Sequence, residues 1–411
     1  MEVEMIPEDK LPLQLWIEIF SRLPVKVLVR LRCVSKTWRS FIDNPNFIQA
    51  HLSAFKNNSG KHFVLSWETR PTEMWEVYEL LIRICTMGKF RHREEIVNFT
   101  FSIRELHYDH KGYVDGLLLF AHHNAAQNST NLIVFNPSIR KLMMLPPFPL
   151  GPPGRAQIVF GYDPLRNDYK VAVIFLPFRM PEDEYPDAIA VYEFSTGCWR
   201  IKSPIEVPDK WCLGPKVFAK GVMHWLCIDL SMLTEQRKLP KNNTHIVSFD
   251  FSSETFSYTE LPGDRGDDSC EKITYPFVLD DSLALFDISN TRTCVWVLRK
   301  CEHSGTNSWR KWYDKATDSE IFEFFREHKY RVKNLLYCEK IKKFLVGVNG
   351  EVKSYDMEKN KMKDVDACFS CHEMGFDTCH CHYVLDPYIE SLVLLKPLDG
   401  CSLTSHTARG E

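Results

Sequence analysis

The residues best suited to chemistry are cysteines and histidines gathered near the C-terminal end of the sequence. They are Cys368, Cys371, His372, Cys379, His380, Cys381 and His382. Two cysteines with a two-residue gap can bring both sulfurs to one zinc ion, and thiolate and imidazole are the usual ligands of structural zinc. The second cysteine pair has a gap of only one residue. The spacing therefore favours a Cys/His-rich loop, and we predict no metal site.

Catalysis has little support elsewhere in the sequence. There is no nucleophile elbow, no glycine-rich phosphate loop and no His-Glu-x-x-His motif. Paired carboxylates occur at Glu94-Glu95, Asp267-Asp268 and Asp280-Asp281, but each pair stands in a polar stretch typical of a solvated turn. We therefore predict a non-catalytic protein without a cofactor. An enzyme with its active site on a repeat fold is the less favoured alternative.

The composition is that of a large globular chain. Its 411 residues exceed one ordinary domain, and 44% are hydrophobic against 26% charged. We expect two or more units, or one large repeat fold. The formal net charge of -3 gives no whole-chain reason to bind nucleic acid or an acidic membrane, so we expect neither as a partner.

The sequence carries no sign of export. Its N-terminus is acidic where a secretory signal would be basic, and no apolar stretch approaches the ~20 residues that a membrane helix needs. We therefore expect a cytoplasmic or nuclear protein. The fourteen cysteines are accordingly predicted to be reduced thiols rather than a disulfide framework.

The segment 11–52 has the pattern of several short helices with more apolar surface than they can bury. Pro12 and Pro24 suit a first helical turn, and Ser35 is a candidate N-cap. Leu15 and Ile19 share one helix face at i, i+4 spacing, while other apolar side chains mark a neighbouring face. So small a unit rarely builds an adequate core. Either the rest of the chain or a partner protein must cover the surplus.

A set of residues at distinctive spacing runs through this segment. The set is Leu11, Pro12, Ile19, Leu23, Pro24, Val25, Lys26, Leu31, Val34, Ser35, Lys36, Trp38 and Arg39. Together they resemble the F-box, which implies docking onto a Skp-type adaptor that leads to cullin and RING subunits. The implied adaptor contacts are Leu11, Pro12, Ile19, Leu23, Pro24 and Leu31. The implied core of the module is Leu15, Val34, Trp38 and Phe41.

From about Phe63 the sequence changes to short β-branched or aromatic runs that end in turn residues. They include 117–120, 132–135, 158–160, 170–175, 188–194, 217–228, 246–251, 277–286, 294–298, 344–348 and 388–395. A weak repeat of roughly 45 to 60 residues underlies them. The pattern predicts a large all-β region, most simply a β-propeller-like repeat of four-stranded units. An irregular pair of β-sandwiches is the alternative.

Short motifs in this region occur in a characteristic order. They are Asp115-Gly116-Leu117-Leu118, Asn136-Pro137-Ser138, Phe160-Gly161-Tyr162-Asp163, Asp168-Tyr169-Lys170-Val171, Gly221 with His224-Trp225-Leu226, and Tyr388-Ile389-Glu390-Ser391-Leu392. They resemble the plant F-box-associated, kelch-like region, which implies a β scaffold that binds a protein target. One helix is expected to interrupt the strands, because Thr317 and Glu320 fit a capping box. We predict that it packs on the scaffold.

These observations predict the domain order and the function. We expect a tail at 1–10, the F-box module at 11–52, a linker and the start of the β region at 53–110, the F-box-associated kelch-like domain at 111–398, and a tail at 399–411. The resemblance implies the substrate-recognition subunit of a Skp–cullin–F-box ubiquitin ligase, with its target left open. An adaptor-binding protein that acts outside a degradative complex is the alternative.

Overall fold

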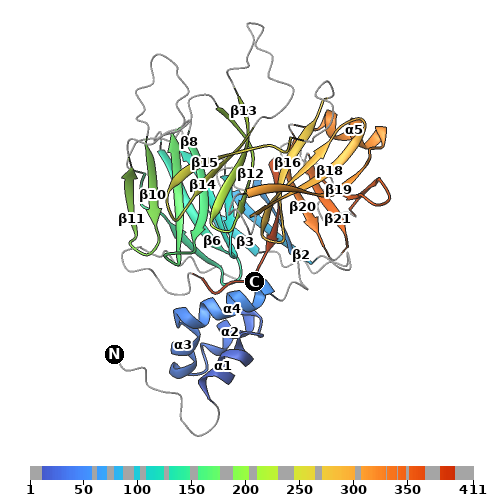
Figure 1. The fold of residues 1–411 in the computed structure, drawn as a ribbon. Coiled ribbons are helices and arrows are strands. Elements are labelled where there is room, and N and C mark those ends of the chain that lie inside the picture. The colour runs from blue at the N-terminus through green and yellow to red at the C-terminus, as the bar shows by residue number, and fades with distance from the viewer. Residues whose placement is uncertain are drawn as a thin grey trace. The chain divides into compact units, whose positions relative to one another are not determined.

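The computed structural model places four helices ahead of a long series of strands (Figure 1). It describes residues 12–57, 63–71, 78–86, 97–101, 108–124, 129–148, 156–175, 188–202, 211–229, 245–263, 271–300, 307–329, 331–339, 341–348, 351–365 and 380–393. The chain divides into two compact units. One comprises residues 1–154, 192–199 and 387–411, and the other comprises residues 155–191 and 200–386. The predicted order, an all-α module and then an all-β region, is confirmed.

The four N-terminal helices are short and begin at recognisable residues. They are α1 (Leu13–Phe20), α2 (Val25–Leu31), α3 (Lys36–Ile42) and α4 (Pro45–Asn57). Ser35 caps α3 as predicted, because its hydroxyl accepts a hydrogen bond from the Trp38 N–H at 3.1 Å. Pro12 and Pro24 occupy the N-cap positions of α1 and α2, just ahead of the predicted first turn. Helix α4 continues past residue 52, where we expected the module to end.

The strands in the described part of the chain form six four-stranded sheets. The first has the order β24-β1-β2-β3, with β1 (Phe63–Pro71), β2 (Tyr78–Thr86), β3 (Val97–Phe101) and β24 (His380–Tyr388). The second has the order β4-β5-β6-β7, with β4 (Tyr108–Val114), β5 (Leu117–Asn124), β6 (Ser129–Asn136) and β7 (Lys141–Met144). The third has the order β11-β10-β9-β8, with β8 (Ala156–Asp163), β9 (Asp168–Phe175), β10 (Ile189–Glu193) and β11 (Cys198–Lys202).

Like the second and third sheets, the remaining sheets take their four strands consecutively from the chain, whereas the first sheet combines β24 with β1 to β3. The fourth contains β12 (Trp211–Ala219), β13 (Val222–Asp229), β14 (His245–Asp250) and β15 (Thr255–Glu260). The fifth contains β16 (Ile273–Leu279), β17 (Ser282–Ile288), β18 (Arg292–Lys300) and β19 (Asn307–Ala316). The sixth contains β20 (Val332–Cys338), β21 (Lys343–Val348), β22 (Glu351–Asp356) and β23 (Lys361–Asp364). Four consecutive strands per sheet is the repeat unit of a β-propeller.

Three of the predicted strand runs differ from the structure. The run 217–228 is the end of β12, a turn and β13. The run 277–286 turns at Asp280-Asp281, where φ is 48° and 55°, so this acidic pair lies in a turn as predicted. The run 388–395 was wrong as a strand, because β24 ends at Tyr388 and residues 389–393 have no regular structure. Hydrophobic runs alone do not distinguish a hairpin from one strand.

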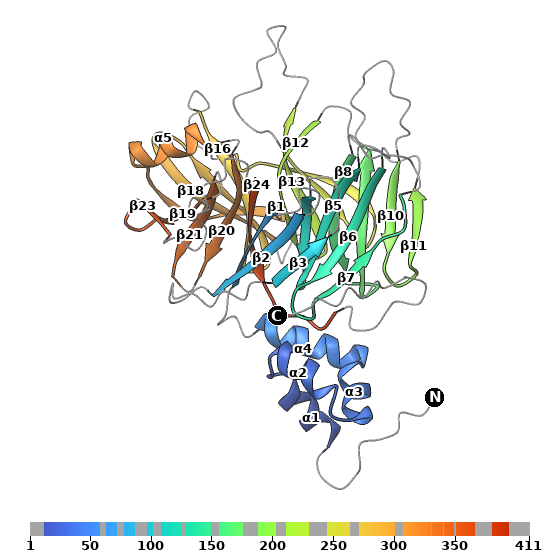
Figure 2. The same cartoon turned by 180° about the vertical axis from the view of Figure 1, so that it is seen from behind.

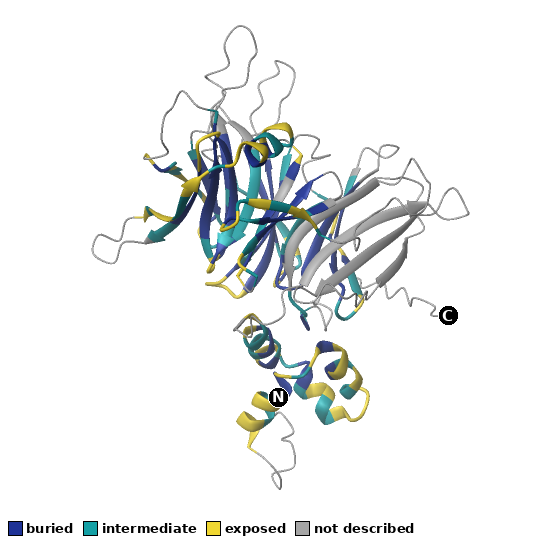
Figure 3. Cartoon of the chain, turned by 90° about the vertical axis from the view of Figure 1, so that its right-hand side faces the viewer, coloured by how far each residue is buried: buried dark blue, intermediate teal, exposed yellow. Residues whose placement is uncertain are grey.

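Among the described side chains, the buried ones concentrate on the inner strands of the sheets. Buried residues are dark blue in Figure 3. In the second unit, Phe286 of β17 lies 5.1 Å from Phe344 of β21 between ring centroids. Helix α5 (Ser319–Glu327) adds Phe322 and Phe325 to the same cluster. The predicted packing of this helix on the scaffold is confirmed. Its N-cap is Asp318, which accepts a hydrogen bond from the Glu320 N–H at 2.9 Å, and is not the predicted Thr317.

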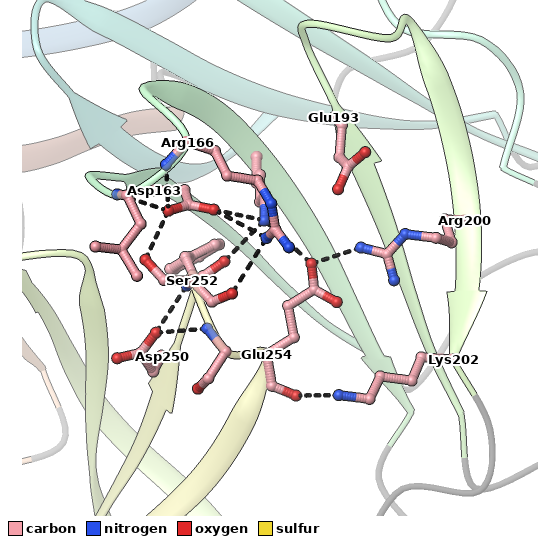
Figure 4. A network of polar contacts seen from close by, with 12 residues as sticks. Asp163, Arg166, Glu193, Arg200, Lys202, Asp250, Ser252 and Glu254 are labelled. Atoms are coloured by element: carbon pink, nitrogen blue, oxygen red, sulfur yellow. Dashed lines mark hydrogen bonds and ion pairs between the residues drawn. The ribbon is translucent and has the colours of Figure 1, made fainter.

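An ion network within the second unit joins β9 to the turn between β14 and β15 (Figure 4). Lys170 is fully buried, and its Nζ lies 2.8 Å from Asp163 Oδ2 and 3.1 Å from Glu254 Oε1. The same ammonium donates to the Phe251 carbonyl at 2.9 Å. The Ser252 hydroxyl donates to Asp163 Oδ1 at 2.6 Å. Lys170 and Asp163 belong to sequence motifs of the β region, and the network gives those motifs a structural purpose.

Both carboxylates of the network are held in the ionised form. Burial by itself would raise the pKa of Asp163, but hydrogen bonds from Lys170 and Ser252 outweigh it and keep the pKa well below its usual range. Burial likewise opposes ionisation of Glu254, and hydrogen bonds from Arg200 and Lys170 lower its pKa. A buried ammonium without these partners would be unstable.

We predict that Lys170→Met destabilises the protein by about 3–5 kcal/mol, because it removes the fully buried cation that Asp163 and Glu254 share. Chemical unfolding monitored by circular dichroism measures the change. Lys315→Met is the matched control, since Lys315 forms an exposed pair with Glu358 and such pairs contribute about 1 kcal/mol or less. Equal losses in the two variants would contradict the structural role of Lys170.

Candidate adaptor-docking surface

The inner face of the helical module is a cluster of aromatic rings. Phe20 of α1 lies 5.6 Å from Trp38 and 5.4 Å from Phe41, both on α3, between ring centroids. Phe41 lies 4.6 Å from Phe47 of α4. Trp16 shares the inward face of α1 with Phe20 at i, i+4 spacing and packs on the same cluster. This packing fixes the rotation of α1 and thereby selects the residues that face outward.

The outward side of the module is apolar as well. Leu13, Leu15, Ile19, Val27 and Val34 are 59%, 41%, 47%, 36% and 66% exposed, and we call these five residues the outer apolar face. They make up half of the large hydrophobic residues exposed in the described part of the chain. Exposed apolar side chains gathered in one small segment mark an interaction surface.

The structure corrects part of the predicted module core. Leu15 and Val34 were expected to be buried, but both are exposed members of the outer apolar face. In α1 the alternative face with Trp16 and Phe20 points inward, because two large rings bury more apolar area than two aliphatic chains. Val34 lies in the turn between α2 and α3, where no helix period constrains it. Trp38 and Phe41 pack on the cluster.

The residues assigned to adaptor contact fall into three groups. Pro12, Ile19 and Pro24 are exposed. Leu23 and Leu31 are partly buried and pack on the module's own cluster. Leu11 lies outside the described residues. Leu13 and Val27 are also exposed, although the sequence did not predict them as contacts. Leu13 is the first residue of α1 and is exposed there although it lies on the same helix face as Trp16 and Phe20.

Polar contacts hold the turns behind this face. Arg32 after α2 donates two hydrogen bonds to Asp43 after α3, at 2.6 and 3.0 Å. His51 Nε2 donates to the Leu23 carbonyl at 3.0 Å. Burial lowers the pKa of His51, and this hydrogen bond opposes the shift only in part, so the imidazole is neutral. The module therefore offers a preformed apolar surface.

The described part of the β region contains an open hollow. It has a volume of about 740 Å³ and is lined by Tyr258 to Gly263 together with Trp296, Asn307 and Trp309. Tyr258 is 53% exposed. Trp309 is held in place by its indole N–H, which donates to the Glu260 carbonyl at 2.8 Å. Exposed aromatic side chains of this kind are common anchors in protein interfaces.

Within the described residues, no group of three or more His, Cys, Asp or Glu side chains could hold a metal ion. Cys368, Cys371 and Cys379 lie outside those residues, and for Cys381 only the backbone in β24 is described. None of the helices so described is long and apolar enough to cross a bilayer.

Comparison with known proteins identifies the family. An F-box domain model matches residues 9–49, and a model of the F-box associated beta propeller domain matches residues 72–395. The chain therefore belongs to the plant F-box proteins with a C-terminal F-box associated β-propeller domain. In general, proteins of this family are non-catalytic substrate receptors of Skp–cullin–F-box ubiquitin ligases, and the F-box implies binding to a Skp-type adaptor.

The relatives are F-box proteins of Arabidopsis thaliana. F-box protein CPR1 is 25% identical over 93% of this chain and 89% of its own length. Putative F-box protein At3g10240 is 35% identical over 40% of each chain. F-box protein At1g47340 is 28% identical over 76% of this chain and 65% of its own. The identity is too low to carry a target from one protein to another.

We predict that leucines on the two faces of the module differ sharply in their effect on stability. Leu28→Ala removes a fully buried side chain and should cost about 2–5 kcal/mol. Leu15→Ala removes an exposed one and should change stability by about 0.5 kcal/mol or less. Hydrogen exchange of the α2 and α4 amides measures both. A larger loss for Leu15→Ala than for Leu28→Ala would restore the original assignment of Leu15 to the core.

Proposed function

We propose that this protein is the substrate receptor of a Skp–cullin–F-box ubiquitin ligase and docks the Skp-type adaptor through its outer apolar face. The observation that carries the proposal is the exposure of Leu15, Ile19 and Val34 on a module whose inner face is already filled. An adaptor groove that accepts these side chains would remove them from water. Docking of an apolar helix face into a groove is a common mode of recognition.

The adaptor contact extends over both the helices and their turns. Pro12 and Pro24 are exposed at the N-cap positions of α1 and α2, and their rings keep the backbone at these ends preorganised. Leu23 and Leu31 contribute from partly buried positions beside the face. Few of these residues are expected to dominate the binding energy, because hot spots lie at the centre of an interface.

The β region holds the target in this proposal. The hollow beside Tyr258 and Trp309 is the candidate contact, since it combines an exposed ring with a second ring fixed by a hydrogen bond. The protein itself performs no bond chemistry. It raises the local concentration of target lysines near the ubiquitin-conjugating enzyme that the cullin and RING subunits recruit.

We predict that Leu15→Asp combined with Ile19→Asp weakens adaptor binding at least tenfold, because two charges would have to be desolvated in an apolar contact. Calorimetry with purified Skp-type adaptor and the full chain measures the affinity. Leu165→Asp is the control, because Leu165 is 85% exposed in the turn between β8 and β9. Its affinity for the adaptor should equal that of the wild type.

An additional variant tests the sequence-based assignment. Leu23→Ala with Pro24→Ala should also reduce binding, while hydrogen exchange in β14 and β17 stays unchanged. Unaltered adaptor affinity in both double variants would overturn the proposed docking surface.

A further inference from the structure

A short segment near the C-terminal end, Ile389 to Val393, lies between the helical module and the sheet of β4 to β7. We call it the clamp. The clamp, the four helices and this sheet all belong to the first compact unit. Its first four residues belong to the motif Tyr388-Ile389-Glu390-Ser391-Leu392, and all five lie in the run 388–395 that was predicted to be a strand. The sheet that it contacts is seen in Figure 2, where β5, β6 and β7 lie next to one another.

The clamp is held on the sheet by hydrogen bonds between side chains of the sheet and the backbone of the clamp. Asn136, fully buried at the end of β6, donates from its amide to the carbonyls of Ser391 at 2.9 Å and Val393 at 2.8 Å. The Ser391 N–H donates to the Ser138 hydroxyl at 3.1 Å. The Ile389 N–H donates to the Tyr113 hydroxyl at 2.7 Å. Side chains of the sheet thus satisfy the polar groups of an irregular segment, as buried backbone requires.

The turn between β4 and β5 approaches the clamp closely. Asp115 and Gly116 have φ of 51° and 83°, which suits a tight Asp-Gly hairpin turn. A Cβ on Gly116 would lie 2.6 Å from the Ile389 carbonyl oxygen and 2.6 Å from the Ser391 Cβ. The turn therefore needs glycine both for its backbone conformation and for the space that the clamp occupies.

The other side of the clamp packs against the helical module. Leu392 is 1% exposed and belongs to the same cluster as Phe20 and Leu28. Glu390 Oε2 accepts a hydrogen bond from the Val25 N–H at 3.1 Å. Pro24 at the N-cap of α2 makes no side-chain capping bond, so the carboxylate of Glu390 serves that end of the helix instead. A negative charge at a helix N-terminus is also favoured by the helix dipole.

Direct contacts between helices and sheet flank the clamp. Lys56 Nζ at the end of α4 lies 2.6 Å from Asp115 Oδ1. Ile139, between β6 and β7, packs on the helical cluster. Burial lowers the pKa of Lys141 on β7, and the nearby Arg32 guanidinium lowers it further. The helices and the sheet therefore also contact one another outside the clamp.

We infer that the clamp makes the helical module and the β4–β7 sheet one rigid body, with Gly116, Asn136, Glu390 and Leu392 as positioning residues for ubiquitin transfer. A rigid connection fixes the direction in which the outer apolar face points relative to this sheet. Transfer by proximity depends on such geometry, because a misplaced lysine is reached less often. The inference rests on the proposed function for its biological meaning, whereas the rigidity itself is independent of it.

The direct test measures the distance between the two parts in the full chain, first without and then with the adaptor. Nitroxide labels on encoded non-natural amino acids at Ser40 in α3 and Met144 in β7, both exposed, report the distance distribution by double electron–electron resonance. The wild type should give one narrow distribution. Gly116→Ala should give a broad one, because the new Cβ displaces the clamp. Gly221→Ala is the matched control: its φ is 82° in another hairpin turn, and its distribution should stay narrow.

Leu392→Ala, with Leu165→Ala as its control, tests the same inference if Gly116→Ala folds poorly. Leu392→Ala should speed hydrogen exchange of α2 amides by about tenfold or more, because the helical cluster loses a buried side chain. Exchange in β17 should not change, and Leu165→Ala should change neither. A broad distribution in the wild type, or a narrow one in Gly116→Ala together with unchanged α2 exchange in Leu392→Ala, would overturn the inference. Loss of adaptor binding in the wild type would instead contradict only the proposed function.

Discussion

A module of four short helices cannot bury two apolar faces at once, and this constraint governs how the protein is built. One face is closed by aromatic rings around Phe20 and is completed by Leu392 from the distant end of the chain. The other face, which contains Leu15 and Ile19, stays in contact with water. Among the described residues, only one face is covered, and an exposed apolar face of this kind is typical of an interaction surface.

The motifs of the β region have structural explanations in many cases. Lys170 is the cation of a buried network, Gly116 makes room for the clamp, and Asn136 binds the clamp's carbonyls. Residues of this kind define the scaffold. Loops on a rigid scaffold can vary without loss of the fold.

Much of the fold could be predicted from the sequence, because helix caps and turns depend on a few neighbouring residues. The Ser35 cap and the Asp280-Asp281 turn are examples. The orientation of α1 could not be predicted, since Leu15 and Trp16 mark competing apolar faces and only tertiary packing selects one. The hydrogen bond between Val25 and Glu390 could not be predicted either, because it joins residues that are 365 positions apart in the sequence. The family resemblance supplied the partner that helix periodicity alone left open.

In the proposed complex the adaptor covers the outer apolar face. Hydroxyl-radical footprinting of the full chain, free and bound to a purified Skp-type adaptor, tests this by measuring the oxidation rate of individual side chains. Leu15, Ile19 and Val34 should be oxidised several-fold more slowly in the complex, while the oxidation of Leu165 and Tyr258 should be unchanged. Equal oxidation of the three residues in the free and bound protein, with the complex formed, would contradict it.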